Sequence, residues 1–106
     1  MAWPNDADGD VLRRLEESGF DFSSEHTLDF NVDLASWPPP DELLSVIHRR
    51  FDNARSVPPE NHYRGYVQFR IKGHVTYDLV TSVQREASQL ARQFGGVCES
   101  WGVWQE

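Results

Sequence analysis

Polar and hydrophobic residues alternate in two segments of the chain, residues 27–34 and 63–72. Successive side chains of a strand point to opposite faces, so each segment is predicted to be a strand that buries one face. The buried positions are Leu28, Phe30, Val32 and Leu34, and then Tyr63, Gly65, Val67, Phe69 and Ile71. The polar positions between them are Thr27, Asp29, Asn31 and Asp33, and then Arg64, Tyr66, Gln68, Arg70 and Lys72.

Three other segments repeat their apolar residues at helical spacing. They predict a short helix from a cap at Asp6 or Asp8 to about Ser18, a second helix between Pro40 and Asp52, and a long helix over residues 76–94. The core positions of the second helix are Leu43, Leu44, Ile47 and Phe51. Gly95 is predicted to end the long helix, because glycine adopts the left-handed conformation of a helix C-terminus.

Two further strands complete the pattern. Residues 54–57 predict a short edge strand that Pro58 and Pro59 end, since proline is confined to the edges of sheets. Residues 58–62 then form a hairpin loop. After Gly95 and Gly96, the β-prone residues up to Trp104 predict the last strand.

The predicted order is helix, strand, helix, strand, strand, helix, strand, in a single domain of residues 1–106. Its last six elements are the split βαβ pattern of a ferredoxin-like αβ sandwich, an α+β fold. In this fold the first and third strands pair in the middle of a four-stranded antiparallel sheet, with the fourth strand beside the first. Two helices cover one face of the sheet, and the N-terminal helix is additional.

The other face of the sheet, left open by the two helices, is predicted to be polar. On it, Asp29, Asn31 and Asp33 lie opposite the polar positions of the third strand. One interpretation is a solvated face on which opposite charges neutralise each other. The other is a recognition surface with Tyr66 as an aromatic anchor.

The last strand admits two orientations. Simple alternation places Glu99 and Trp101 together on the open face, and Cys98, Ser100, Gly102 and Trp104 on the side of the helices. We favour this orientation because an unpaired buried carboxylate is unfavourable. The alternative places Trp101 in the core, with a bulge near Gly102.

Charge limits the classes of partner. The net charge is −7, and residues 1–42 hold eleven acidic but two basic side chains. Binding to a nucleic acid needs clustered basic residues, so direct nucleic-acid binding is not expected. An acidic surface suits a basic protein partner.

Candidate catalytic and metal-binding residues are few. The acids of residues 6–17 resemble a calcium loop, but Val11 stands where the tight turn requires glycine. The four histidines are scattered and Cys98 is alone, so neither a metal site, a cofactor nor a disulfide is predicted. Without a signal peptide or a membrane span, the chain is expected in the cytoplasm, as a monomer or weak homodimer.

Several motifs resemble the regulator of ribonuclease E activity B (RraB) family. They are residues 10–21 with their Gly-Phe-Asp ending, His26 with the alternating strand, Phe94-Gly95-Gly96, and Trp101-Gly102. The family's last strand reads Tyr-Asp-Gly-Trp, whereas this sequence has Cys98-Glu99-Ser100-Trp101 and keeps the acid and the tryptophan. The resemblance implies a ferredoxin-like sandwich and a non-catalytic role, in which the protein binds ribonuclease E and inhibits RNA cleavage. Inhibitory members carry an acidic C-terminal tail, whereas this sequence ends at Glu106, so another basic RNA-processing protein is also expected as a partner.

Three hypotheses of function follow. The first is a non-catalytic protein-binding regulator, and the second is an antitoxin-like immunity protein. The third is an enzyme or small-ligand binder with a pocket around Trp101, Tyr66, Arg70 and His74. The predicted partner-binding residues are Asp21, Asp29, Asp33, Tyr66, Arg70, Glu99 and Trp101.

Overall fold

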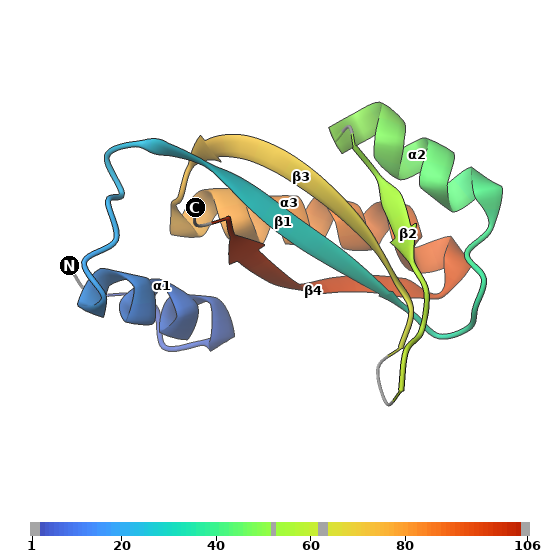
Figure 1. The fold of residues 1–106 in the computed structure, drawn as a ribbon, viewed down its shortest axis with the longest axis horizontal. Coiled ribbons are helices and arrows are strands. Elements are labelled where there is room, and N and C mark those ends of the chain that lie inside the picture. Colours follow the sequence, from blue (N-terminus) through green and yellow to red (C-terminus); the bar gives the residue numbers. More distant parts are fainter. Residues whose placement is uncertain (1–2, 52, 62–63, 105–106) are drawn as a thin grey trace.

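The computed structural model describes residues 3–51, 53–61 and 64–104. Within these residues, three α-helices lie against an open antiparallel sheet of four strands, which confirms the predicted α+β class (Figure 1). The elements in chain order are α1 (Ala7–Glu17), β1 (Glu25–Leu34), α2 (Asp41–Phe51), β2 (Arg55–Val57), β3 (Tyr66–His74), α3 (Tyr77–Ala91), the 3-10 turn η1 (Arg92–Phe94) and β4 (Gly96–Val103).

The strand order in the sheet is β2-β3-β1-β4, as the split βαβ pattern predicts. β1 and β3 pair antiparallel in the middle, from Glu25 opposite His74 to Asp33 opposite Tyr66. β3 begins and ends later than residues 63–72, and Tyr63 lies outside the described residues.

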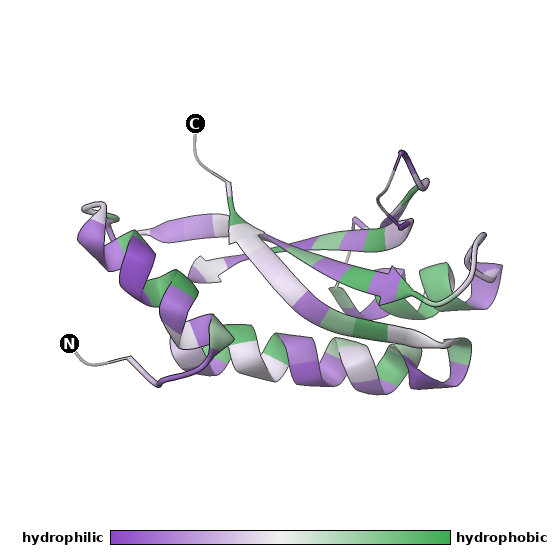
Figure 2. Ribbon diagram, turned by 90° about the horizontal axis from the view of Figure 1, so that it is seen from below, coloured by the Kyte–Doolittle hydropathy of each residue, from purple (hydrophilic) through white to green (hydrophobic). Residues whose placement is uncertain are grey.

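The hydrophobic core lies between the sheet and the helices. Figure 2 shows the strands on one side of α3, with hydrophobic and hydrophilic residues mixed along them. Phe69 of β3 stacks on Phe30 of β1 and on Phe51 of α2, with ring centroids 5.4 and 4.4 Å apart. The predicted core positions of β1 are buried, as are Leu43, Ile47 and Phe51 of α2. Alternation and helical spacing therefore identified the main core faces.

The N-terminal helix α1 extends the helical layer. Asp6 is its N-cap and accepts a hydrogen bond from the backbone N–H of Gly9 at 2.7 Å, as predicted. Leu12 is fully buried, and the helix packs beside α3. α1 therefore does not cover the open face of the sheet.

The long helix ends earlier than predicted. Regular α-helix stops at Ala91, and η1 carries the chain on to Phe94. Gly95 follows in the left-handed conformation, with φ of 76°, and allows the chain to turn back into β4. Within the described part of the chain, no helix is long and apolar enough to cross a membrane.

A β-bulge interrupts β4. Cys98 lies opposite Val32, and Ser100 lies opposite the neighbouring Asn31. Glu99 between them is therefore an extra residue that has no partner on β1. An extra residue shifts the alternation of faces by one position for the rest of the strand.

Because of this bulge, Trp101 faces the helices. It lies opposite the core residue Phe30, and its indole Nε1 donates a hydrogen bond to Asp8 of α1 at 2.9 Å. The favoured prediction, with Trp101 beside Glu99 on the open face, is therefore wrong. The alternative with a bulge is correct in orientation, although the bulge lies at Glu99 and not near Gly102.

Candidate functional site

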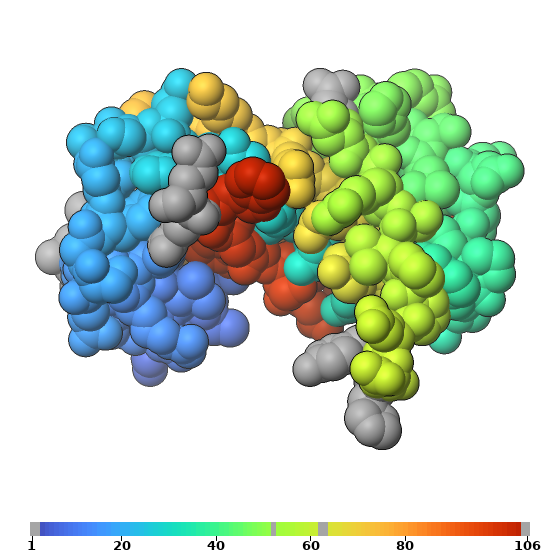
Figure 3. All heavy atoms as spheres, viewed as in Figure 1, coloured from blue at the N-terminus to red at the C-terminus, as the bar shows by residue number. Residues whose placement is uncertain are grey.

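The open face of the sheet is the candidate site. Figure 3 shows this face, with the strands set back between the N-terminal segment and the region of β2. Among the described residues, the three α-helices all pack on the other side. The open face therefore presents a recessed and largely polar surface.

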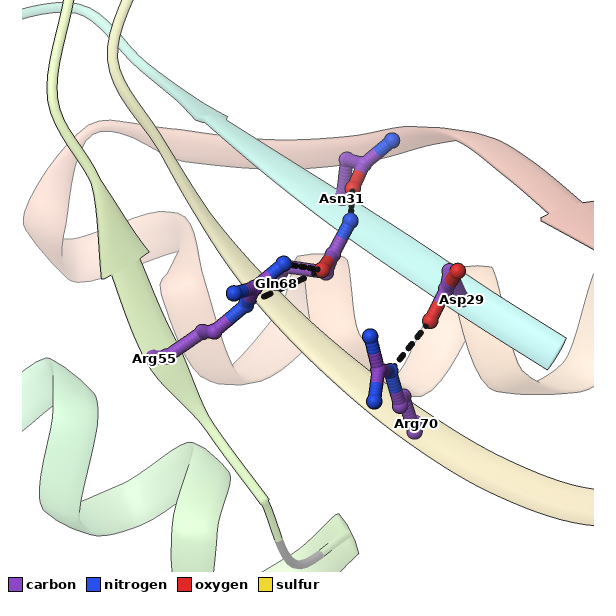
Figure 4. A network of polar contacts seen from close by, with 5 residues as sticks. All are labelled: Asp29, Asn31, Arg55, Gln68 and Arg70. Atoms are coloured by element: carbon purple, nitrogen blue, oxygen red, sulfur yellow. Dashed lines mark hydrogen bonds and ion pairs between the residues drawn. The ribbon is translucent and has the colours of Figure 1, made fainter. Parts of the chain in front are cut away.

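A row of hydrogen bonds crosses all four strands of this face, and Figure 4 shows the part of it from Arg55 to Asn31. We call it the polar ladder, and its members are Arg55 of β2, Gln68 of β3, Asn31 of β1 and Ser100 of β4. The Arg55 guanidinium donates to Gln68 Oε1 at 2.7 and 3.1 Å. The amide of Gln68 donates to Asn31 Oδ1 at 3.1 Å, and that of Asn31 donates to Ser100 Oγ at 3.2 Å. The ladder orders the centre of the face and divides it into two halves.

One half holds a charged and aromatic cluster, the Arg70 platform, which consists of Asp29, Arg70 and Trp104. Arg70 Nε donates to Asp29 Oδ1 at 2.8 Å, and its guanidinium lies 4.4 Å from the centre of the Trp104 ring. The Trp104 backbone N–H donates to the carbonyl of Thr27 at 2.9 Å, which holds the residue at the end of β4. The Trp104 side chain is nevertheless 48% exposed. A stacked arginine and an exposed tryptophan thus stand together on the surface.

The other half contains an open hollow of about 790 Å³. Its floor follows one row of the sheet, in which Val57, Tyr66, Asp33 and Val97 lie in register on β2, β3, β1 and β4. Further lining residues are Asn31, Leu34, Ala35, Pro58, Glu60, Arg64, Gly95 and Glu99. The hollow therefore combines an apolar and aromatic floor with charged groups.

Negative charge exceeds positive charge in the hollow. Among the described residues that line it, Asp33, Glu60 and Glu99 are acidic and only Arg64 is basic. Burial raises the pKa of the neighbouring Cys98 thiol to about 12, and the charges of Asp33, Asp8 and Glu99 raise it further in the same direction. Burial and the neighbouring carboxylates therefore favour the protonated thiol over the thiolate, the form that acts as a nucleophile.

The structure places five of the seven predicted partner-binding residues on the open face. Asp29 and Arg70 form the predicted cross-strand ion pair in the Arg70 platform. The hollow contains the other three, Asp33, Tyr66 and Glu99.

The remaining two residues lie elsewhere. Trp101 faces the helices, and Asp21 lies in the connection between α1 and β1. The Asp21 carboxylate accepts hydrogen bonds from the hydroxyls of Ser23 and Ser24 and from the backbone N–H of Ser23. These bonds, led by that of the Ser23 hydroxyl, lower the Asp21 pKa to about 2. Asp21 therefore organises a local turn.

The Asp21 turn yields a prediction for the pH titration of the protein. Removing both hydroxyls with Ser23→Ala and Ser24→Ala should raise the Asp21 pKa toward the ordinary value near 3.8. Since the folded pKa is depressed, the turn's contribution to stability is complete above about pH 4 and disappears as the pH falls through about 2. An NMR titration of the side-chain carboxyl carbon measures the shift, and Ser36→Ala serves as a control. An unchanged midpoint in the double variant would contradict this role of the serines.

Three features of the site were missed by sequence reasoning. Trp104 was assigned to the helix side, because the bulge that reverses the last strand leaves no signal in simple alternation. Ser100 was assigned to the helix side for the same reason. Glu60 lies in the connection after β2, and only the path of this connection brings it to the hollow.

Two other predicted kinds of site can be compared with the structure. The small-ligand pocket around Trp101, Tyr66, Arg70 and His74 is not formed, since Trp101 faces the helices and the hollow contains only Tyr66 of the four. In the described ranges, no three His, Cys, Asp or Glu side chains converge to hold a metal ion.

Comparison with known proteins identifies the family. A family model described as regulator of ribonuclease activity B matches residues 5–103, which is almost the whole chain. A search of curated proteins gave no match. The family match confirms the resemblance inferred from the Gly-Phe-Asp and Gly-Gly motifs. The chain therefore belongs to the family of regulators of ribonuclease activity B.

Proposed function

We propose that this protein regulates a ribonuclease, with ribonuclease E as the first candidate, by binding it through the open face of the sheet. The protein carries out no catalytic step itself. The Arg70 platform is the observation that carries the proposal, because it presents an ordered arginine and an exposed tryptophan on a face that α1, α2 and α3 leave uncovered.

The composition of the platform supports a protein partner. Tryptophan and arginine are the residues most enriched among those that dominate binding energy in protein interfaces. The ion pair with Asp29 and the ring of Trp104 hold the Arg70 guanidinium before a partner arrives. A side chain that is already ordered loses less conformational entropy on binding.

The chemistry of the open face favours binding over catalysis. The polar ladder joins amide, hydroxyl and guanidinium groups, which supply hydrogen bonds, and the Asn31 amide that contacts the Ser100 hydroxyl is not a base that could activate it. Burial raises the pKa of the Cys98 thiol, which favours its protonated form. Regulation by contact requires only a surface complementary to the partner, and the hydrogen-bonding and aromatic groups of the open face support this role.

The excess of acid in the hollow favours a basic partner. Asp33, Glu60 and Glu99 outnumber Arg64 there, and the chain as a whole has a net charge of −7. Proteins that process RNA carry basic surfaces for their substrate. Contact with such a surface would accelerate association and make binding sensitive to salt.

The test compares two arginines that have similar surroundings. Arg70 pairs with Asp29 and lies over Trp104 on the open face, whereas Arg50 pairs with Glu86 and lies over Phe51 on the helical side. Arg70→Ala should weaken binding to ribonuclease E about tenfold or more, since such hot-spot residues contribute more than about 1 kcal/mol. Arg50→Ala should change binding by about twofold or less. Calorimetry measures binding, and a cleavage assay measures regulation.

Each result has a defined meaning. If the wild-type protein neither binds ribonuclease E nor changes its rate of RNA cleavage, ribonuclease E is not its target. If Arg50→Ala weakens binding as much as Arg70→Ala does, the open face is not the binding surface. Circular dichroism spectra of both variants verify that they are folded.

A further inference from the structure

The hollow on the open face has a specific chemical character. Along its floor, Asp33 lies in register between Tyr66 on β3 and Val97 on β4. The carboxylate is therefore placed beside an aromatic ring and an apolar side chain. Glu99, the extra residue of the bulge, and Glu60, from the connection after β2, add two more carboxylates to the lining.

No basic side chain that the structure describes pairs with these carboxylates. Among the described residues, the side chains of Asp33, Glu60 and Glu99 form neither an ion pair nor a hydrogen bond. Asp33 is also half-buried, so water screens its charge incompletely. Arg64 lines the hollow but is exposed and forms no ion pair with them. The hollow thus retains a negative potential that a cation would complement.

The arrangement suits arginine better than lysine. A guanidinium is planar and weakly hydrated, and it can stack on an aromatic ring while donating two hydrogen bonds to one carboxylate. Tyr66 provides the ring, and Asp33 and Glu99 provide acceptors. A lysine ammonium is strongly hydrated and lacks the flat surface that stacking requires.

We infer that the hollow receives an arginine side chain from a basic segment of the protein partner, with the guanidinium on Tyr66 and against the carboxylates of Asp33 and Glu99. This inference rests on the proposed function and names the chemistry by which the open face recognises its partner. The Arg70 platform would contact the partner on the other side of the polar ladder.

A peptide experiment tests the inference with the full chain. The probe is a fluorescein-labelled peptide of four arginines alternating with serines, and its counterpart carries lysines at the same positions. Fluorescence anisotropy at low ionic strength measures the affinity for each. The arginine peptide should bind about tenfold more tightly than the lysine peptide, because only a guanidinium both stacks and donates in pairs. Tyr66→Leu should remove most of this preference.

Matched charge variants separate the hollow from the general negative charge of the protein. Asp33→Asn with Glu99→Gln removes two charges from the hollow at nearly constant side-chain volume, and should weaken the arginine peptide about tenfold. Glu17→Gln with Glu42→Gln removes two exposed charges from α1 and α2 and should weaken it about twofold or less. Absence of peptide binding, equal affinity for both peptides, or equal losses in both pairs of variants would overturn the inference.

The same proteins distinguish this inference from the proposed function. If the hollow binds the arginine peptide but wild-type protein leaves ribonuclease E unaffected, the proposed function fails and the arginine site stands. If ribonuclease E is bound and regulated while the hollow variants behave like wild type, the arginine site alone fails.

Discussion

Replacing Asp8 by alanine is expected to lower the free energy of unfolding by about 3 kcal/mol, because a carboxylate that joins three elements is lost. Asp8 accepts a hydrogen bond from Trp101 Nε1 of β4 at 2.9 Å. The side-chain amide of Gln84 on α3 also donates to Asp8, and its Nε2 lies 3.1 Å from both carboxylate oxygens. Gln84 is buried and Trp101 is half-buried, so the variant leaves two donors poorly hydrated. Urea unfolding followed by circular dichroism measures the change.

Asp10→Ala is the control for this prediction. Asp10 stands in the first turn of the same helix, so its charge interacts with the helix dipole as that of Asp8 does. Among the described residues, its carboxylate pairs only with Arg13, whose side chain is largely exposed, and such a contact contributes about 1 kcal/mol or less. The difference between the two variants therefore isolates the bonds to Trp101 and Gln84. Equal losses of stability would show that these bonds contribute nothing beyond the dipole.

The Asp8 contacts also explain which acids of the N-terminal segment are structural. Asp6 caps α1 and accepts a hydrogen bond from the Tyr77 hydroxyl at 2.6 Å. Asp8 links α1 to β4 through its hydrogen bond with Trp101. The sequence predicted capping by these acids but not their distant partners. Tyr77 and Trp101 follow Asp6 and Asp8 by many residues, and local patterns carry no information on such contacts.

How far the sequence predicted this fold depends on the range of the interactions involved. The β1 positions from Leu28 to Leu34 alternate without interruption, so their burial and their pairing with β3 were predicted correctly. β4 was assigned correctly as a strand, but its faces were not. A single extra residue at Glu99 reverses the orientation of Trp101 and Trp104, and this bulge depends on the register with β1. Fold class is thus set by local periodicity, whereas the composition of the open face depends on tertiary register.

The bulge has consequences for both halves of the open face. It carries Trp101 into the helical layer, where Asp8 binds it, and brings Trp104 onto the open face beside Arg70. It also adds Glu99 to the lining of the hollow. Ser88 of α3 bonds to the backbone N–H and carbonyl of Cys98, at 2.9 and 3.2 Å, next to the bulge. Backbone groups that are bonded in this way are not free to pair with the strand of another chain, and bulges further hinder such pairing.

Gly65→Ala is expected to destabilise the protein by about 3 kcal/mol, because the new methyl group would overlap the Trp37 ring. A Cβ atom on Gly65 would lie 2.2 Å from Trp37 Cε3 and 2.4 Å from Cζ3, well inside van der Waals contact. Trp37 packs against the core, so its ring cannot move aside without loss of contacts. Thermal and urea unfolding measure the effect.

Gly102→Ala provides the matched control, since a Cβ atom there would meet no heavy atom within 4 Å. Both substitutions reduce the entropy of the unfolded chain equally, by about 0.4–1 kcal/mol, so Gly102→Ala should be neutral or slightly stabilising. Trp37→Ala tests whether the ring causes the loss of stability. In the Trp37→Ala background, Gly65→Ala should no longer destabilise the protein to the same extent. A loss of stability that persists without the Trp37 ring would place the conflict in the backbone around Gly65, just before β3. If the ring is the cause, Trp37 fixes the position of Gly65. The same substitution should then weaken binding of the arginine peptide by displacing the adjacent Arg64 at the hollow.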